Sequence, residues 1–100
     1  MSILRLFVVC ARDARAQQRI ERDLCELTAS IPAEAGYEAC HLLSQTDGLM
    51  VGFVSVWASM EHAQRFQDGA LNSLITAFVE MEIVGNAVVK LFRILEGGTQ

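Results

Sequence analysis

Apolar and β-branched residues gather in four short segments of this 100-residue chain. Their composition and alternation are typical of β-strands. The segments are residues 3–10, 37–44, 49–57 and 87–95. Asp47-Gly48 lies between the second and third segments, and this dipeptide favours a tight hairpin turn. The pattern therefore predicts four strands, the middle two forming a hairpin.

Two further segments repeat apolar residues at helical spacing. Asp13 can cap the amino end of the first helix, and Pro32 ends it. The second helix begins after Ser59, another capping residue, is interrupted at Asp68-Gly69 and continues over residues 70–81. The apolar stripe of the first helix is Ile20, Leu24, Leu27 and Ile31.

The resulting order is β-α-β-β-α-β, the ferredoxin-like arrangement of an α+β fold. It predicts a four-stranded antiparallel sheet with both helices on one face, and hence one uncovered face. A chain of this length forms one domain, residues 1–100. Residues 96–100 are expected to form a tail.

Alternation gives each strand two readable faces. One set of residues is mostly small and aliphatic, and we assign it to the face beneath the helices. It includes Leu4, Leu6, Val8, Gly52, Val54 and Val56. The other set combines aromatic with polar residues, and we assign it to the uncovered face. It includes Arg5, Phe7, Tyr37, His41, Phe53, Ser55, Trp57, Lys90 and Phe92.

A sheet face with so many aromatic residues is more apolar than a monomer usually exposes. We therefore expect a homodimer in which the same open sheet face of a second chain covers it. Two facing sheets would enclose a barrel-like space able to hold a small hydrophobic or aromatic ligand. Trp57 would wall this space at its rim and anchor the dimer.

Charge and composition exclude several classes of partner. The net charge is −4 and there is a single lysine, so nucleic acid is not an expected partner. No stretch approaches the roughly 20 apolar residues of a membrane span, and the amino-terminal segment does not have a signal-peptide pattern. We expect a cytoplasmic protein that does not interact with membranes.

The stretch VSVWASMEHAQRF, with Gly36 upstream, resembles the antibiotic biosynthesis monooxygenase family of dimeric α+β barrels. The resemblance covers residues 3–95 and implies homodimers with a ligand cavity in each subunit. Some members of this family oxidise polycyclic aromatic compounds with molecular oxygen and without a cofactor, others cleave haem, and many have no known activity. The tryptophan at the strand end of the family corresponds to Trp57.

The chain departs from the family pattern at several polar positions. Where members often carry a histidine in the second helix, this chain has Phe66. The haem-degrading members combine an asparagine, a tryptophan and a histidine. The matching positions here are a first strand without asparagine, then Phe66 and Thr76, so haem degradation by that triad is not expected.

His41 is the candidate catalytic residue, because a neutral imidazole in an apolar cavity can act as a base. Arg5 would stabilise a substrate anion. This reading requires a cavity of roughly 300 Å³ or more with His41 pointing into it. No metal or other cofactor is expected. The proposed substrate-binding residues are Trp57, Phe53, Tyr37, Ser55, Arg5 and Phe66.

The sequence therefore supports a cofactor-independent monooxygenase or small oxidoreductase acting on an aromatic or quinone-like compound. The alternative is a dimeric protein that binds a small molecule, or serves as an interaction module, without catalysis. In that case His41 is a hydrogen-bonded interface residue and the aromatic residues only pack.

Overall fold

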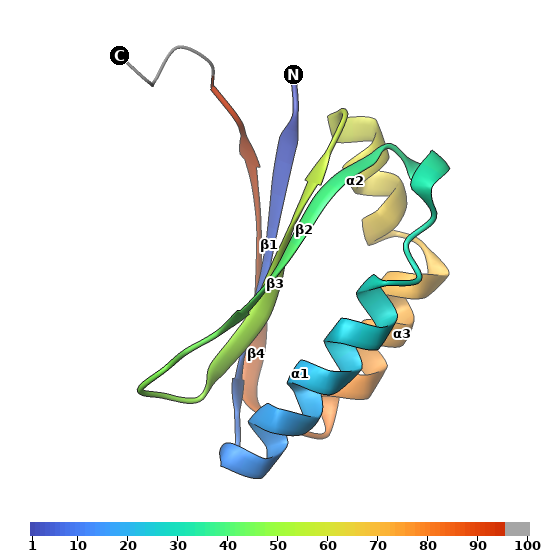
Figure 1. Cartoon of the computed structure of the whole chain (residues 1–100). Coiled ribbons are helices and arrows are strands. Elements are labelled where there is room, and N and C mark those ends of the chain that lie inside the picture. Colours follow the sequence, from blue (N-terminus) through green and yellow to red (C-terminus); the bar gives the residue numbers. More distant parts are fainter. Residues whose placement is uncertain (96–100) are drawn as a thin grey trace.

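A computed structural model describes residues 1–95, so the expected tail at 96–100 lies outside the described residues. One antiparallel sheet has the strand order β2-β3-β1-β4, and all the helices cover one of its faces (Figure 1). The predicted α+β ferredoxin-like fold is confirmed. Its elements are β1 (Ile3–Ala11), α1 (Ala14–Thr28), a 3-10 turn (Ala33–Ala35), β2 (Tyr37–Ser44), β3 (Met50–Trp57), α2 (Met60–Gln67), α3 (Ala70–Glu80) and β4 (Ile83–Arg93).

Side-chain caps set the helix starts, as the sequence predicts. Asp13 Oδ1 accepts a hydrogen bond from the backbone N of Ala16 at 2.7 Å, and Ser59 Oγ accepts one from the backbone N of His62 at 3.2 Å. The interruption at Asp68-Gly69 divides the second helical segment into α2 and α3. The sheet therefore carries three helices where two were expected.

Two element boundaries differ from the prediction by three residues or more. α1 ends at Thr28, three residues before Ile31, and a short 3-10 turn follows Pro32. β4 begins at Ile83, four residues before the predicted strand start at 87. Gly85 and Asn86 therefore lie within β4, where its register against β1 shifts, and Gly85 has a φ of 71°.

The assignment of sheet faces was wrong for β1 and β3. Arg5 and Phe7 are buried in β1, as are Ser55 and Trp57 in β3. They lie beneath the helices with the rest of the core, and the ladder pairs Arg5 with Ser55. Phe53, paired with Phe7, is buried on the same side.

Tyr37 was also assigned wrongly, because its ring lies 5.7 Å from that of Trp57, on the helix side. The large side chains fill the layer between sheet and helices because each of them removes a large area from water there. The small aliphatic residues of β1 and β3 form the uncovered face instead.

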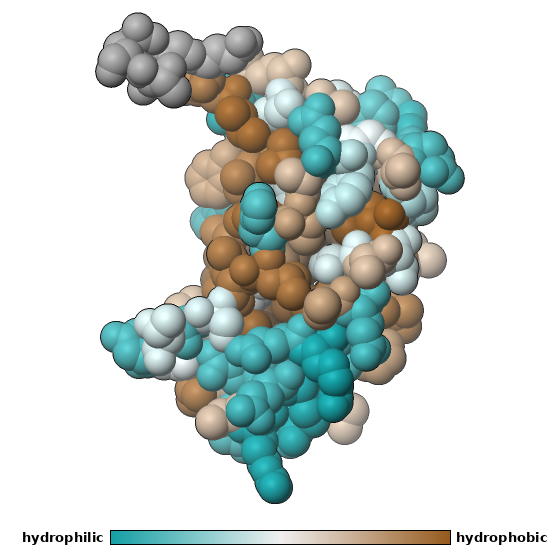
Figure 2. All heavy atoms as spheres, viewed as in Figure 1, coloured by the Kyte–Doolittle hydropathy of each residue, from teal (hydrophilic) through white to brown (hydrophobic). Residues whose placement is uncertain are grey.

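The open sheet face combines those aliphatic residues with residues that were assigned to it correctly. His41 pairs with Val54, and Phe92, 51% exposed, pairs with Leu4. Lys90 is on the same face as Phe92 in β4 and is paired with Leu6. Figure 2 shows apolar side chains gathered over the strands, whereas the surface over the start of α1 is hydrophilic.

None of the helices in residues 1–95 has the length and apolar character needed to cross a membrane.

Candidate functional site

A buried arginine lies at the centre of the layer between the sheet and the helices. Arg5 is only 1% exposed. Its Nε donates to Gln67 Oε1 at 3.3 Å and its Nη2 to Asn72 Oδ1 at 3.1 Å. Its Nη1 is buried and has no hydrogen-bond partner within residues 1–95. A buried donor of this kind is rare, because leaving it unpaired costs about 1–3 kcal/mol.

The break between α2 and α3 supplies both partners of this arginine. Gln67 is the last residue of α2, and Asn72 lies in the first turn of α3. Asn72 Nδ2 also donates to the backbone O of Gln67 at 2.9 Å, which holds the two helix ends together. A continuous helix would not bring these two amides to one point.

Electrostatically, Arg5 is a cation without a nearby anion. It forms no salt bridge with any carboxylate of the part of the chain that is described, and its Cζ lies 5.2 Å from the ring centre of Phe66 and 5.9 Å from that of Phe7. Desolvation by burial lowers the pKa of Arg5 to about 10. A group with that pKa is still charged at neutral pH.

Trp57 adjoins this centre. It is fully buried, and its Nε1 donates to Ser55 Oγ at 2.9 Å. Its ring lies 4.9 Å from that of Phe66. Because Ser55 is the cross-strand partner of Arg5, the sheet places the indole, the hydroxyl and the guanidinium in one continuous group.

A cavity of about 210 Å³ lies on the outer side of the aromatic pair. Trp57 and Phe66 form part of its wall, together with His62 and Arg65 of α2, and Ile31 and Leu71 add apolar surface. Arg5 does not line this cavity. Phe66 borders the cavity and also lies close to Arg5, so its ring adjoins both.

His62 brings an imidazole to the same cavity. Its Nδ1 lies 2.7 Å from Ser59 Oγ. Its ring packs against Gly36, where a Cβ would overlap the imidazole and where φ is 80°. His62 is therefore held from two sides.

Burial raises the pKa of the Tyr37 hydroxyl, and also that of the Cys40 thiol beside it. Both groups are therefore neutral at neutral pH. Within residues 1–95, no three histidine, cysteine, aspartate or glutamate side chains lie close enough together to hold a metal ion.

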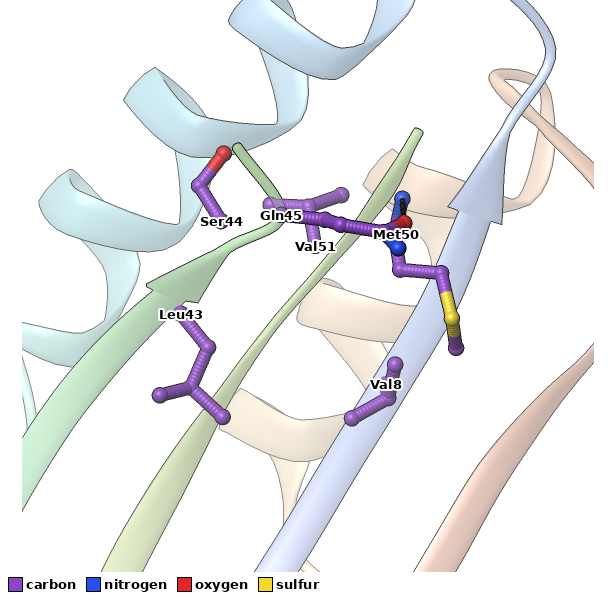
Figure 3. A pocket seen from close by; sticks show the side chains of 6 residues that line it. All are labelled: Val8, Leu43, Ser44, Gln45, Met50 and Val51. Atoms are coloured by element: carbon purple, nitrogen blue, oxygen red, sulfur yellow. Dashed lines mark hydrogen bonds between the residues drawn. The ribbon is translucent and has the colours of Figure 1, made fainter. Parts of the chain in front are cut away.

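A second hollow, of about 340 Å³, lies at the β2–β3 hairpin (Figure 3). Val8 and Leu43 border it, and both are paired with Gly52 of β3. Met50 and Gln45 complete one side. This hollow contains no charged residue and belongs mainly to the open sheet face.

No family model and no curated protein matches the sequence. Solved structures do match, although at low identity. A provisionally assigned antibiotic biosynthesis monooxygenase from Caulobacter crescentus superposes with a TM-score of 0.79 at 18% identity, covering 95% of this chain and 91% of that one. SnoaB, a cofactor-independent oxygenase from Streptomyces nogalater, gives 0.72 at 12% identity, with 99% and 98% covered. The chain has the fold of the antibiotic biosynthesis monooxygenases.

A third solved structure with a similar fold is a dimeric ferredoxin-like protein of unknown function from Jannaschia sp. CCS1. It superposes with a TM-score of 0.77 at 11% identity, with 94% of this chain and 100% of that one covered. The identities are low, so these likenesses concern the fold.

Within this monooxygenase fold, most of the expected site residues come together, but on the helix side of the sheet. Arg5 is paired with Ser55 across the sheet and lies close to the ring of Phe66. Trp57 contacts both Ser55 and Phe66. Tyr37 contacts Trp57, and Phe53 contacts Phe7 beneath them.

His41 is not part of this group. It is exposed on the open sheet face, on the opposite side from the cavity beside Trp57. Its role as a base stays a prediction that depends on a second chain covering that face.

Sequence reasoning missed His62, Gln67 and Asn72. The sequence feature that could have indicated the two amide residues is the polar interruption at Asp68-Gly69, which separates two apolar helix faces. Nothing in the spacing of His62 alone distinguished it from a surface residue.

Proposed function

We propose that the chain is a cofactor-independent oxygenase acting on an aromatic or quinone-like compound, and that Arg5 stabilises the substrate anion. The observation that carries this proposal is the buried, unpaired charge of Arg5 with its unpartnered Nη1. Burying a charge without a partner opposes folding, so such groups gather at functional sites. A planar guanidinium bordered by two phenylalanine rings suits a planar anion.

The chemistry requires a substrate that can become an electron-rich anion. A base removes a phenolic proton, and the anion then reacts with molecular oxygen at a ring carbon. With 1-naphthol, the C4–H bond is broken and a C4–O bond forms. One oxygen atom becomes the new carbonyl of 1,4-naphthoquinone, and the other leaves as water. Arg5 would stabilise the negative charge throughout.

Phe66 controls how a substrate reaches Arg5. The cavity beside Trp57 is below the usual range of about 300–1,000 Å³ for ligand pockets, so it suits a ligand of one or two rings. Rotation of the Phe66 ring would join the cavity to the Arg5 centre. Trp57 would form part of the apolar wall around the bound ring.

We also propose a homodimer formed through the open sheet face. This face exposes Leu43, Val88 and Phe92 beside the aliphatic residues of β1 and β3. The description of the Jannaschia protein as dimeric supports the same arrangement here. A two-fold pairing would bury this face against the same face of the second chain and would also cover the hollow at the β2–β3 hairpin.

The alternative function is binding without catalysis. The close packing of Trp57 and Phe66, with ring centres 4.9 Å apart, favours it, because a ligand could fill the cavity without ever contacting Arg5. The catalytic function requires Arg5 to contact the substrate, whereas binding alone does not.

The test is oxidation of 1-naphthol under labelled oxygen (¹⁸O₂), followed by mass spectrometry of the quinone. The proposal expects one labelled atom in each 1,4-naphthoquinone formed, at a rate above that without protein. Arg5→Met should lower this rate by about 100-fold, the size expected when one charge-stabilising donor is removed. Arg93→Met, at an exposed position of β4, is the matched control.

Quenching of Trp57 fluorescence measures binding independently. Naphthol that binds but incorporates no label would support the non-catalytic alternative. Naphthol that neither quenches Trp57 nor is oxidised would contradict both functions for this class of ligand.

A further inference from the structure

We infer that His62 is the base that removes the phenolic proton from a substrate in the cavity beside Trp57. This inference rests on the proposed function, because it assigns a role within the same site. His62 borders the same cavity of about 210 Å³ as Trp57 and Phe66. A phenol bound in this cavity would therefore lie beside the imidazole.

Ser59 is placed to accept a hydrogen bond from Nδ1 in the tautomer that a base needs. Its Oγ already accepts a hydrogen bond from the backbone N of His62 and lies 2.7 Å from Nδ1. With the proton on Nδ1 directed at this oxygen, the lone pair of the neutral ring is on Nε2. The same contact is retained when the ring becomes positively charged.

Gly36 fixes the plane of the imidazole. A Cβ at this position would overlap Cγ and Cδ2 of His62 and lie 2.8 Å from Nε2. The ring can occupy this place only because position 36 has no side chain. Together, Gly36 and Ser59 hold the imidazole without using Nε2, which has no hydrogen-bond partner in residues 1–95.

The charged neighbours are compatible with proton transfer. Arg65 borders the cavity, and it is paired with Glu61 one turn earlier on α2. In the proposed step, the phenolic O–H bond breaks and the proton moves to Nε2. The products are a phenolate and an imidazolium ring. The phenolate charge is attracted to Arg5 behind Phe66, and Nδ1–H stays on Ser59.

His41 cannot do this in the same chain, since it lies on the opposite side of the sheet. The two histidines of the chain therefore give a direct comparison.

The experiment uses 4-nitrophenol, whose phenolate absorbs visible light whereas the phenol does not. Titrating the protein into this probe, at a pH where the free probe is mainly the phenol, should raise the phenolate absorbance. His62→Asn keeps a polar atom near Ser59, and His62→Gln keeps one near the Nε2 position, but neither is basic. Both variants should lose the rise in absorbance and oxidise 1-naphthol about 100-fold more slowly.

Quenching of Trp57 fluorescence shows whether each variant still binds the probe. Retained quenching with lost ionisation in both variants, while His41→Gln ionises the probe as the wild type does, is the expected result. Ionisation that survives in the His62 variants, or is lost in His41→Gln instead, would overturn the inference. If the wild type itself does not bind, the proposed function fails for this ligand class, which is a different outcome.

Discussion

Arg5 is a charged side chain in a position that would ordinarily hold a leucine or methionine. Its guanidinium is surrounded by Phe7, Phe66 and two amide groups, and no acid of the described chain is paired with it. An apolar residue of similar size often replaces such a buried charge without loss of stability. This argument supports our proposal that Arg5 serves ligand binding rather than stability.

We predict that Arg5→Met leaves the free energy of unfolding unchanged or raises it by about 1–2 kcal/mol, because the desolvation penalty disappears. Urea unfolding followed by circular dichroism would measure this. A loss of several kcal/mol would mean that Arg5 is primarily a structural residue.

Gly52 is the position at which a single methyl group should be most harmful. A Cβ there would overlap the carbonyl oxygen of Phe7 and lie 2.8 Å from Val8 Cα, and both are backbone atoms of β1. We predict that Gly52→Ala lowers the free energy of unfolding by about 2 kcal/mol or more. Gly48→Ala is the control, since its Cβ would meet only the movable Gln45 side chain. Equal stability of the two variants in urea would contradict this.

The three cysteines should differ in reactivity. All are free; Cys25 is exposed, whereas burial raises the pKa of Cys40. Because the thiolate is the reactive form, a raised pKa keeps Cys40 protonated until higher pH. We predict that iodoacetamide at neutral pH modifies Cys25 first and Cys40 much more slowly, as peptide mass spectrometry would show. Faster labelling of Cys40 would indicate that the layer around Tyr37 is open.

At the scale of secondary-structure elements, the order of strands and helices could be predicted from the sequence, but the sides of the sheet could not. Alternation divides a strand into two sets and does not say which set is covered. In β1, Arg5 made one set look solvent-facing, although its charge is buried beneath α2 and α3. In β4 and in most of β2 the charge pattern agreed with the faces, and His41 and Phe92 were placed correctly, whereas Tyr37 at the start of β2 was not.

The site itself could be predicted only in part, for a related reason. Trp57, Ser55 and Arg5 were grouped correctly because they share one face of neighbouring strands. Gln67 and Asn72 join them only through the angle between two helices, and periodicity contains no information on that angle.

The break between α2 and α3 should be energetically coupled to Arg5. Asn72→Ala removes the acceptor of Nη2 and the bond to the Gln67 carbonyl, so we predict a loss of about 1–3 kcal/mol of unfolding free energy. In an Arg5→Met background the loss should be smaller, because one of the two bonds is already absent. Gln64→Ala, on the exposed side of α2, is the control. Strict additivity in this double-mutant cycle would argue against the coupling.

At the scale of the whole molecule, the sheet has one side packed against helices and one side of exposed aliphatic residues (Figures 1 and 2). Val8 lies near the middle of this open sheet face, paired with Gly52 on one side and Val88 on the other. A second chain seated here would shield it from water.

We predict that the wild-type protein sediments as a dimer and that Val8→Glu converts it to a monomer, because a buried carboxylate would face its own copy across the two-fold axis. Gln18→Glu, at an exposed position of α1, adds the same charge and should leave the dimer intact. Analytical ultracentrifugation at micromolar concentration decides this. A wild-type monomer would exclude the proposed interface.

The irregularity at Gly85-Asn86 has a consequence for how many copies can associate. It interrupts the register along β4, which is an outer strand of the sheet, so this border is a poor template for adding strands from neighbouring molecules. Growth into filaments through the border is thereby discouraged, while a pairing of broad sides closes on itself after two chains. The irregular register of β4 is thus expected to oppose filament formation by a protein with a large exposed apolar face.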